Sequence, residues 1–102
     1  MAELSEIAEK IRAKLVGSDL QEGSVLVCVH GLGELLIDAS TCEVFPGRQD
    51  GDPDATVTMD IETLQGLREG TVSPTFAVMM GRISIRGDLD LVGKLAKLMK
   101  GL

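Results

Sequence analysis

The sequence predicts an α+β fold in which a five-stranded, mostly antiparallel sheet is covered on one face by helices. Five segments carry the apolar alternation or the short apolar run of strands, and the segments around them carry the spacing or the start signals of helices. The first three strand segments follow one another with no helix between them, which favours antiparallel hairpins. The chain has 102 residues, of which 44% are hydrophobic, and this is enough material for one core. We therefore expect a single domain over residues 1–102.

The chain begins with a predicted helix and a predicted central strand. Apolar side chains recur at helical spacing until Gly17 ends the helix: Leu4, Ile7, Ala8, Ile11 and Leu15. Residues 24–30, "SVLVCVH", are apolar on both alternating faces. A strand with two apolar faces is typical of the middle of a sheet.

Two further strands are expected to complete an antiparallel meander. The "GLG" turn at residues 31–33 leads into a strand over residues 34–40, and a third strand over residues 42–47 ends at a proline and a glycine. Residues 48–54 are rich in Gly, Pro and Asp and are expected to form a polar loop.

The next segment combines a strand with one apolar face and a capped helix. Residues 55–60 alternate, with Val57 and Met59 on the apolar face and threonines on the other. Asp60 can cap a helix over residues 61–70, in which a terminal glycine follows the last apolar position.

The C-terminal segment is expected to form a short helix, a strand and a long helix. Ser73 and Pro74 are start signals for the short helix over residues 75–80. Residues 82–87, "RISIRG", return to a period of two, with both isoleucines facing inward. Asp88 can cap the last helix, whose apolar residues face one way: Leu91, Val92, Leu95, Leu98 and Met99.

Composition and charge exclude several classes of function. The net charge of −6 argues against nucleic acid as a partner, because phosphates require a basic surface. No apolar run approaches the ~18 residues of a membrane span, and the charged N-terminus does not resemble a signal peptide. We therefore expect a cytoplasmic protein with reduced cysteines at positions 28 and 42.

The C-terminal fifth differs from the rest in charge. Residues 1–81 carry five basic and fourteen acidic side chains, whereas residues 82–102 carry five basic and two acidic ones. Lys94, Lys97 and Lys100 either solvate a helix face and suit its C-terminal dipole or assist transient contact with an anionic membrane surface.

Candidate catalytic and metal-binding residues lack the partners that they need. His30 is the single histidine and has no nucleophile signature near it. Asp50, Asp52 and Asp54 begin like a calcium loop, but the required glycine and closing glutamate are replaced. We expect no catalytic residue, no metal and no cofactor.

The most informative feature is therefore the apolar surplus near the C-terminus. Each of these residues taken alone is typical of a core. As a group, Phe76, Met79, Met80 and Met99 are flexible side chains beside one strand, and methionine-rich surfaces adapt readily to ligands. The pattern admits either a plain core or the lining of an apolar pocket.

Residues 55–102 resemble the sterol carrier protein type two family. The family's C-terminal half contains a short "AF-M-GK" helix, a "KLKIKGD" strand and a leucine-rich helix. Here Phe76, Met79 and Met80 precede Gly81 and Arg82, and "RISIRGD" follows. The N-terminal half is similar in the order of its elements.

This resemblance implies a hydrophobic tunnel between the sheet and the helices that binds a fatty acid, a fatty acyl chain or a sterol-like lipid. It implies binding and transfer without catalysis. Phe76, Met79 and Met80 would line or gate the tunnel, and Ile83 and Ile85 would form its sheet side. The remaining expected lipid-binding residues are Val57, Met59, Leu91, Leu95, Leu98 and Met99.

Two other functions stay open at this point. The same groove could serve an accessory domain that presents isoprenoid or acyl intermediates, or binds a partner's helix, for a biosynthetic enzyme. An enzyme such as a thioesterase would need a Ser, Cys or His constellation, which the sequence lacks.

Overall fold

A computed structural model describes residues 2–18, 20–47 and 52–99, without the side chains of residues 2–4 and 99. Its elements, in chain order, are α1 (Ala2–Leu15), β1 (Ser24–His30), β2 (Gly33–Asp38), β3 (Glu43–Pro46), β4 (Ala55–Asp60), α2 (Ile61–Glu69), α3 (Pro74–Met79), β5 (Ser84–Gly87) and α4 (Leu89–Met99). All the predicted helices and strands are present, and several strand ends differ from the prediction by one or two residues. The predicted fold class is confirmed.

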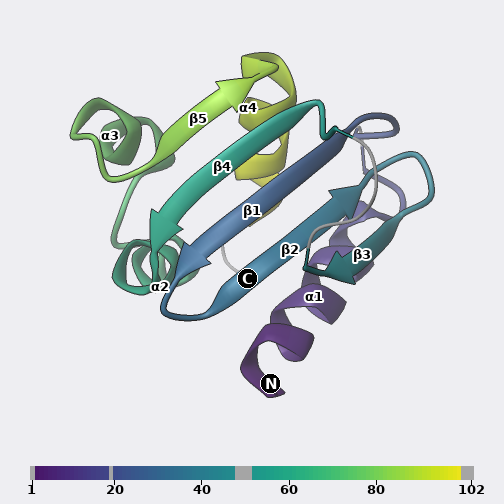
Figure 1. Ribbon diagram of the computed structural model, residues 1–102, viewed down its shortest axis with the longest axis horizontal. Helices are drawn as coiled ribbons and strands as arrows, with labels where there is room; N and C mark the ends of the chain where they lie inside the picture. Colours follow the sequence, from purple (N-terminus) through teal and green to yellow (C-terminus); the bar gives the residue numbers. More distant parts are fainter. Residues whose placement is uncertain (1, 19, 48–51, 100–102) are drawn as a thin grey trace.

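The five strands form one mixed sheet in the order β3-β2-β1-β4-β5 (Figure 1). The β1–β2, β2–β3 and β4–β5 pairs are antiparallel, and β1 pairs with β4 in parallel. The predicted meander and the central position of β1 are therefore confirmed. Strand β4 lies on the side of β1 opposite β2 and runs in the same direction as β1.

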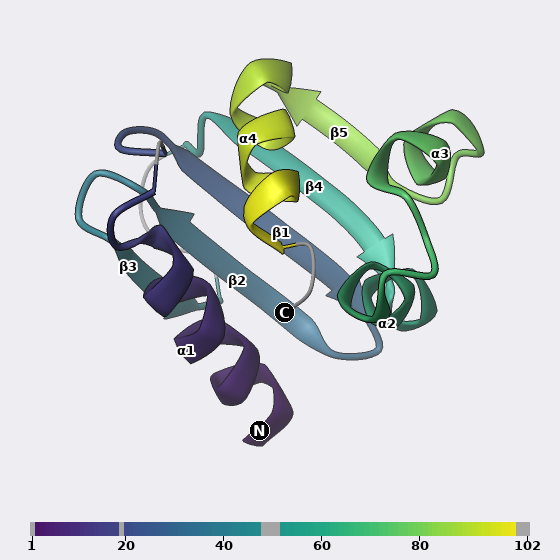
Figure 2. The same cartoon turned by 180° about the vertical axis from the view of Figure 1, so that it is seen from behind.

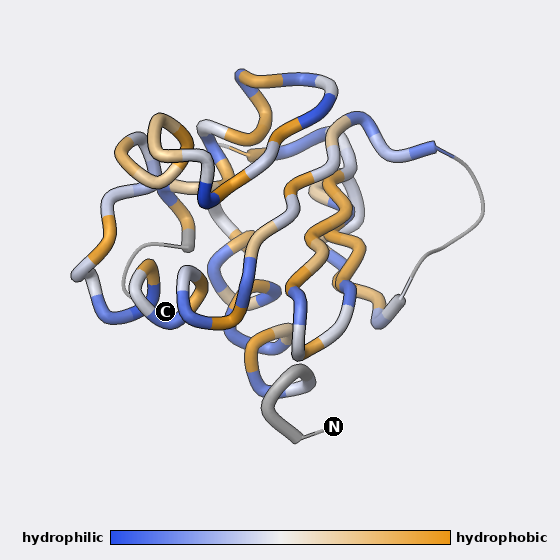
Figure 3. Tube along the Cα trace, turned by 60° about the vertical axis from the view of Figure 1, so that its left-hand side comes forward, coloured by the Kyte–Doolittle hydropathy of each residue, from blue (hydrophilic) through white to orange (hydrophobic). Residues whose placement is uncertain are grey.

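The helices lie on one face of this sheet. Figure 2 shows α1, α2 and α4 in front of the strands, whereas the view in Figure 1 shows the opposite face of the sheet without helices. Alternate strand residues on the helix side form the main core, including Val25, Val27, Leu35 and Ile37. Hydrophobic residues concentrate along the strands in Figure 3, and hydrophilic residues predominate in the connecting loops.

Helix α1 covers the β3 side of the sheet. Its side chains Ile7, Ile11 and Leu15 are buried at helical spacing, which matches the predicted stripe. Nη2 of Arg12 donates a hydrogen bond to the carbonyl oxygen of Val44 at 3.0 Å, so this helix is also fastened to the edge strand.

The connection from β5 to α4 depends on a glycine without a side chain. Gly87 has φ +95°, and an added Cβ would overlap the backbone oxygen of Asp54. Backbone N–H of Asp88 donates to that same oxygen at 3.0 Å, and Oδ1 of Asp88 accepts from N–H of Leu91 at 3.2 Å. The predicted cap of the last helix is confirmed, and the close approach holds the start of α4 against the start of β4.

Candidate functional site

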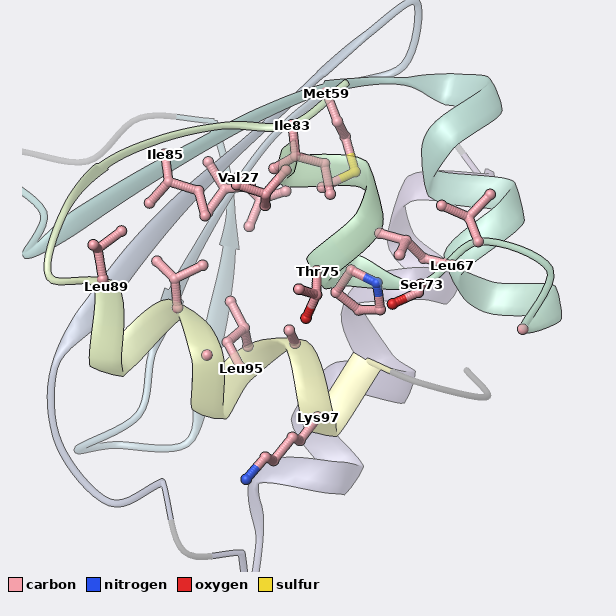
Figure 4. Close-up of a pocket in the computed structure, with 18 of the residues that line it drawn as sticks. Val27, Met59, Leu67, Ser73, Thr75, Ile83, Ile85, Leu89, Leu95 and Lys97 are labelled. Atoms are coloured by element: carbon pink, nitrogen blue, oxygen red, sulfur yellow. The ribbon is translucent and has the colours of Figure 1, made fainter. Parts of the chain in front are cut away.

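An apolar cavity of about 650 Å³ lies between the helix side of the sheet and helices α2, α3 and α4. The sheet contributes Val27 from β1, Val57 and Met59 from β4, and Ile83 and Ile85 from β5 and the turn before it. In Figure 4 the isoleucines and Val27 lie across the cavity from Leu95 of α4. The strand alternation predicted from the sequence thus supplies one whole side of the cavity.

Helix α4 supplies the opposite side because it has two apolar faces. Leu91, Leu95 and Leu98 lie on the face that packs into the core. The second face lines the cavity with Leu89, Val92, Gly93 and Ala96, and Leu95 also reaches it. Gly93 and Ala96 have little or no side chain, and Gly93 is exposed, so α4 leaves the rim of the cavity open beside them. A Cβ added at Gly93 would meet no neighbouring atom within 4 Å.

The third side comes from the end of α2, the connection that follows it, and α3. Its apolar contributors are Leu67, Val72, Pro74 and Val78. Gly66 allows this connection to pack closely, because an added Cβ would overlap the side chain of Val72. Backbone N–H groups of Thr71 and Val72 both donate to the carbonyl oxygen of Gly66, at 2.9 and 3.1 Å.

The start of α2 is held by an acidic cap. Oδ1 of Asp60 accepts a hydrogen bond from N–H of Thr63 at 2.7 Å. Hydrogen bonds from the hydroxyl and the backbone of Thr63 lower the pKa of Asp60 below its ordinary value of 3.8, and the positive charge of Arg82 adds to this effect. The predicted cap is therefore confirmed, and it favours the ionised form of the carboxylate.

The cavity has an apolar interior, and its exposed rim carries both polar and apolar side chains. Val57, Met59, Ile83 and Leu95 are buried. The exposed lining residues include the polar Ser73, Thr75 and Lys97 and the apolar Val78 and Leu89. Figure 4 shows the ammonium group of Lys97 pointing away from the cavity. Within the described part of the chain, the lining contains no His, Cys, Asp or Glu.

The cavity opens to solvent at its mouth, where Ser73, Thr75 and Lys97 are exposed. Water or a ligand can therefore enter and fill it. Because its interior offers water few hydrogen-bond partners, an apolar ligand is the better occupant.

The structure brings together only part of the predicted site. Val57, Met59, Ile83, Ile85 and Leu95 line the cavity. Leu91 is buried in the core and Leu98 is half-buried against it. Neither of them lines the cavity. The side chain of Met99 lies outside the described residues.

The other three predicted residues lie in α3, which contains Phe76 and Met79, or directly after it, at Met80. Phe76, Met79 and Met80 are exposed and do not contribute to the cavity lining. Ala77 is the buried residue of this helix, and its small size lets α3 approach the core while the larger neighbours face outward. Contact of these three side chains with a ligand stays a prediction.

Several residues line the cavity although their sequence signal is only that of a buried strand or helix position. Val27, Leu67 and Val92 are apolar residues of this kind, and they face the cavity. Gly93 and Ala96 carry no hydrophobic signal that would distinguish them. The sequence pattern that could indicate a cavity here is the pair of small residues, three positions apart, in a helix that is otherwise rich in leucine.

The alternative chemical candidates do not assemble a reactive site. Sγ of Cys28 lies 3.1 Å from Oε2 of Glu34, and Sγ of Cys42 lies 3.8 Å from the carbonyl oxygen of Ala39. Oδ2 of Asp54 accepts from N–H of Ser24 at 2.9 Å, so this carboxylate joins two strands. Asp50 lies outside the described residues. Among the described residues, no group of three or more His, Cys, Asp or Glu side chains could hold a metal ion. Of the helices in the described ranges, none combines the length and the apolarity that crossing a bilayer requires.

The fold and the cavity together define a class of small α+β protein, with a mixed five-stranded sheet, helices on one face and an apolar cavity between the layers. Residues 2–100 match the SCP-2 sterol transfer family. The chain therefore belongs to this family, and the resemblance seen in the sequence is confirmed.

Two solved structures and one curated protein are similar to this chain. Sterol carrier protein 2 like 2 from Aedes aegypti is 26% identical, with a TM-score of 0.73 over 92% of this chain and 94% of that chain. The solution structure of its palmitated form gives a TM-score of 0.76 at 26% identity, over 91% and 90% of the two chains. Stomatin-like protein 1 of Mus musculus is 41% identical over 56 residues, which are 55% of this chain. That match spans only 14% of the mouse protein.

Proposed function

We propose that the protein is a non-catalytic lipid-binding and transfer domain, which holds a fatty acid or fatty acyl chain in the cavity between the sheet and α4. The observation that carries this proposal is the separation of an apolar interior from polar groups at the mouth. An acyl chain matches it, because its apolar part can enter while its polar end stays near Ser73 and Thr75. A palmitated relative of the same fold supports this ligand class.

The energetics suit a carrier that must release its ligand. Burying some fifteen methylenes at ~0.8 kcal/mol each stabilises the complex by about 12 kcal/mol. Association costs ~4–15 kcal/mol in lost motional freedom, so net binding is expected to be micromolar or weaker.

A lack of reactive groups in the lining supports a role without catalysis. The hydroxyl groups of the lining belong to Thr71, Ser73 and Thr75. The described lining contains no histidine or carboxylate that could act as a base and activate one of them as a nucleophile. Hydrolysis of acyl-coenzyme A above the uncatalysed rate would contradict this part of the proposal.

Native mass spectrometry with solvent extraction, combined with displacement of a fluorescent fatty acid, tests the proposal. We expect one acyl lipid per protein and displacement by palmitate. Failure to recover any lipid, together with failure of the probe to bind, would refute it. A sterol that displaces the probe more strongly than palmitate would assign a sterol-like ligand, and recovery of an isoprenoid would support the accessory role in biosynthesis.

A further inference from the structure

The polar side chains that the structure describes around the cavity are three hydroxyl groups and one lysine, namely Thr71, Ser73, Thr75 and Lys97. Figure 4 shows Ser73 and Thr75 on the α3 side of the cavity, whereas the ammonium group of Lys97 points away from it. Lys97 lies in the last turn of α4, where a positive charge suits the negative end of the helix dipole. Among the described lining residues, no basic group is therefore directed at a ligand carboxylate.

The charged residues next to the lining do not supply a counter-ion either. Eight of them adjoin a lining residue in the chain without lining the cavity themselves, four acidic and four basic: Asp60, Glu69, Asp88 and Asp90, and Arg68, Arg82, Arg86 and Lys94. The charge of Arg82 acts on Asp60, whose pKa it helps to lower. Arg86 alternates with Ile85 along β5 and so lies on the opposite face of the sheet from the cavity. These eight charges are balanced and do not favour an anion at the rim.

Ser73 and Thr75 are placed to form hydrogen bonds with a ligand. Ser73 occupies the N-cap position of α3, yet its side chain makes no capping hydrogen bond. Both residues are exposed at the rim. The hydroxyl of Thr71, by contrast, donates to the carbonyl oxygen of Gly66 at 3.4 Å. Because a hydroxyl both donates and accepts hydrogen bonds, Ser73 and Thr75 match a polar group that is uncharged.

We propose that the cavity selects single-chain lipids whose polar end is uncharged, such as a primary alcohol or an ester, over the ionised fatty acid. This inference rests on the proposed lipid-binding function and deepens it by naming the polar end of the ligand. A carboxylate seated beside Ser73 and Thr75 gives up part of its water and gains no cation in return. An alcohol or an ester gives up less hydration and forms hydrogen bonds with the two hydroxyls. A fatty acid still binds through its chain, but more weakly.

Displacement of the neutral dye Nile red tests this choice with ligands that differ only in the polar end. Dodecanol and laurate have chains of equal length, and both are used below the concentrations at which they aggregate. At neutral pH we expect dodecanol to bind at least about tenfold more tightly than laurate, and methyl laurate to resemble dodecanol. Equal affinities, or tighter binding of laurate, would overturn the inference and leave the lipid-binding function intact. Failure of all three ligands to displace the dye would instead refute the lipid-binding function.

Removal of a rim hydroxyl tests where the polar end lies. Thr75→Val keeps the shape of the side chain and removes its hydroxyl, so dodecanol should bind about fivefold more weakly. The matched control Thr56→Val makes the same change on the opposite face of the sheet, where Thr56 pairs with Leu26, and should leave binding unchanged. Equal effects of the two substitutions would overturn the assignment of the polar end to this rim.

A change of charge at the rim provides a second test. Ser73→Lys should reverse the preference, because laurate gains a positively charged partner while dodecanol loses a hydroxyl. The variant is expected to fold, since the Ser73 side chain makes no capping hydrogen bond. Retention of the wild-type preference by this variant would overturn the proposal. A loss of about tenfold in laurate binding by Lys97→Gln, with dodecanol binding retained, would also overturn it, because Lys97 would then be the counter-ion of a carboxylate.

Discussion

Gly93 offers a sharp test of the cavity because substitution there should separate stability from ligand binding. The residue lies within α4 on the exposed rim of the cavity, and a Cβ added to it meets no neighbouring atom within 4 Å. Alanine and leucine at this position therefore extend into open space. A glycine in the interior of a helix lowers stability relative to alanine, because glycine loses more conformational freedom on folding.

The expected magnitudes follow from this geometry. Gly93→Ala should raise the free energy of unfolding by about 1 kcal/mol, which corresponds to a rise in Tm of roughly 4–8 °C for a chain of this size. Its single methyl group displaces at most one ligand methylene, so affinity should fall no more than about fourfold. Gly93→Leu occupies the space of about three methylenes, at ~0.8 kcal/mol each, and affinity should fall about 60-fold.

Urea denaturation of the ligand-free protein and displacement of a fluorescent fatty acid measure the two quantities. Lys94→Leu places the same side chain on the neighbouring position, which is also exposed but does not line the cavity, and it should change affinity less than twofold. The reasoning would be refuted if Gly93→Leu bound fatty acid as tightly as the wild type while remaining folded. It would also be refuted if Gly93→Ala lowered stability, since the space beside Gly93 would then be filled.

Three further predictions concern the elements that position the site. Gly87→Ala should lower the free energy of unfolding by about 2–5 kcal/mol, because alanine is strained in the left-handed conformation and its Cβ would overlap Asp54. In the control Gly47→Ala the added Cβ would meet no atom within 4 Å, so only the backbone strain should lower stability. Equal losses of stability in urea denaturation would contradict the close approach at Gly87. The depressed pKa of Asp60 means that its charge stabilises the fold above the ordinary value of 3.8 and that this contribution disappears as pH falls through the lower folded value. The variant Asp60→Asn keeps a capping side chain that does not titrate, so it should lose less stability than the wild type between pH 5 and 3 when thermal unfolding is measured. Identical pH profiles for the two proteins would show that Asp60 is not the titrating cap. Gly66→Ala should destabilise the protein by about 1–3 kcal/mol through contact with Val72, and a wild-type urea midpoint would contradict the packing of the α2–α3 connection.

The sequence predicts the elements well because their signals are local. The period-two pattern around Ile83 and Ile85 and the capping residues Asp60 and Asp88 each depend on neighbours within a few positions. The two apolar faces of β1 also indicate its central place in the sheet. The parallel pairing of β1 with β4 carries no local signal, because it depends on which distant strand comes to lie beside the meander.

The candidate site is harder to predict, since a cavity consists of missing side-chain volume. Hydrophobic spacing on α4 selects Leu91, Leu95 and Leu98, yet the face next to them has the small residues that leave space open. In α3 the large side chains suggested a pocket lining, but Ala77 is the residue that packs inward. Size and hydrophobicity alone do not distinguish a side chain that faces a ligand from one that faces the outside.

Methyl-resolved NMR during titration with palmitate tests the central claim most directly, because it shows both whether the ligand binds and where. The account predicts saturation at one palmitate per protein, with the largest shifts at Ile83, Ile85, Val92 and Leu95. The matched reference is Leu26 and Leu36, which pair with each other across β1 and β2 and lie on the opposite face of the sheet from the core residues Val27 and Leu35. Absence of saturable shifts, or shifts that concentrate at Leu26 and Leu36, would contradict the assignment of the cavity as a lipid-binding site.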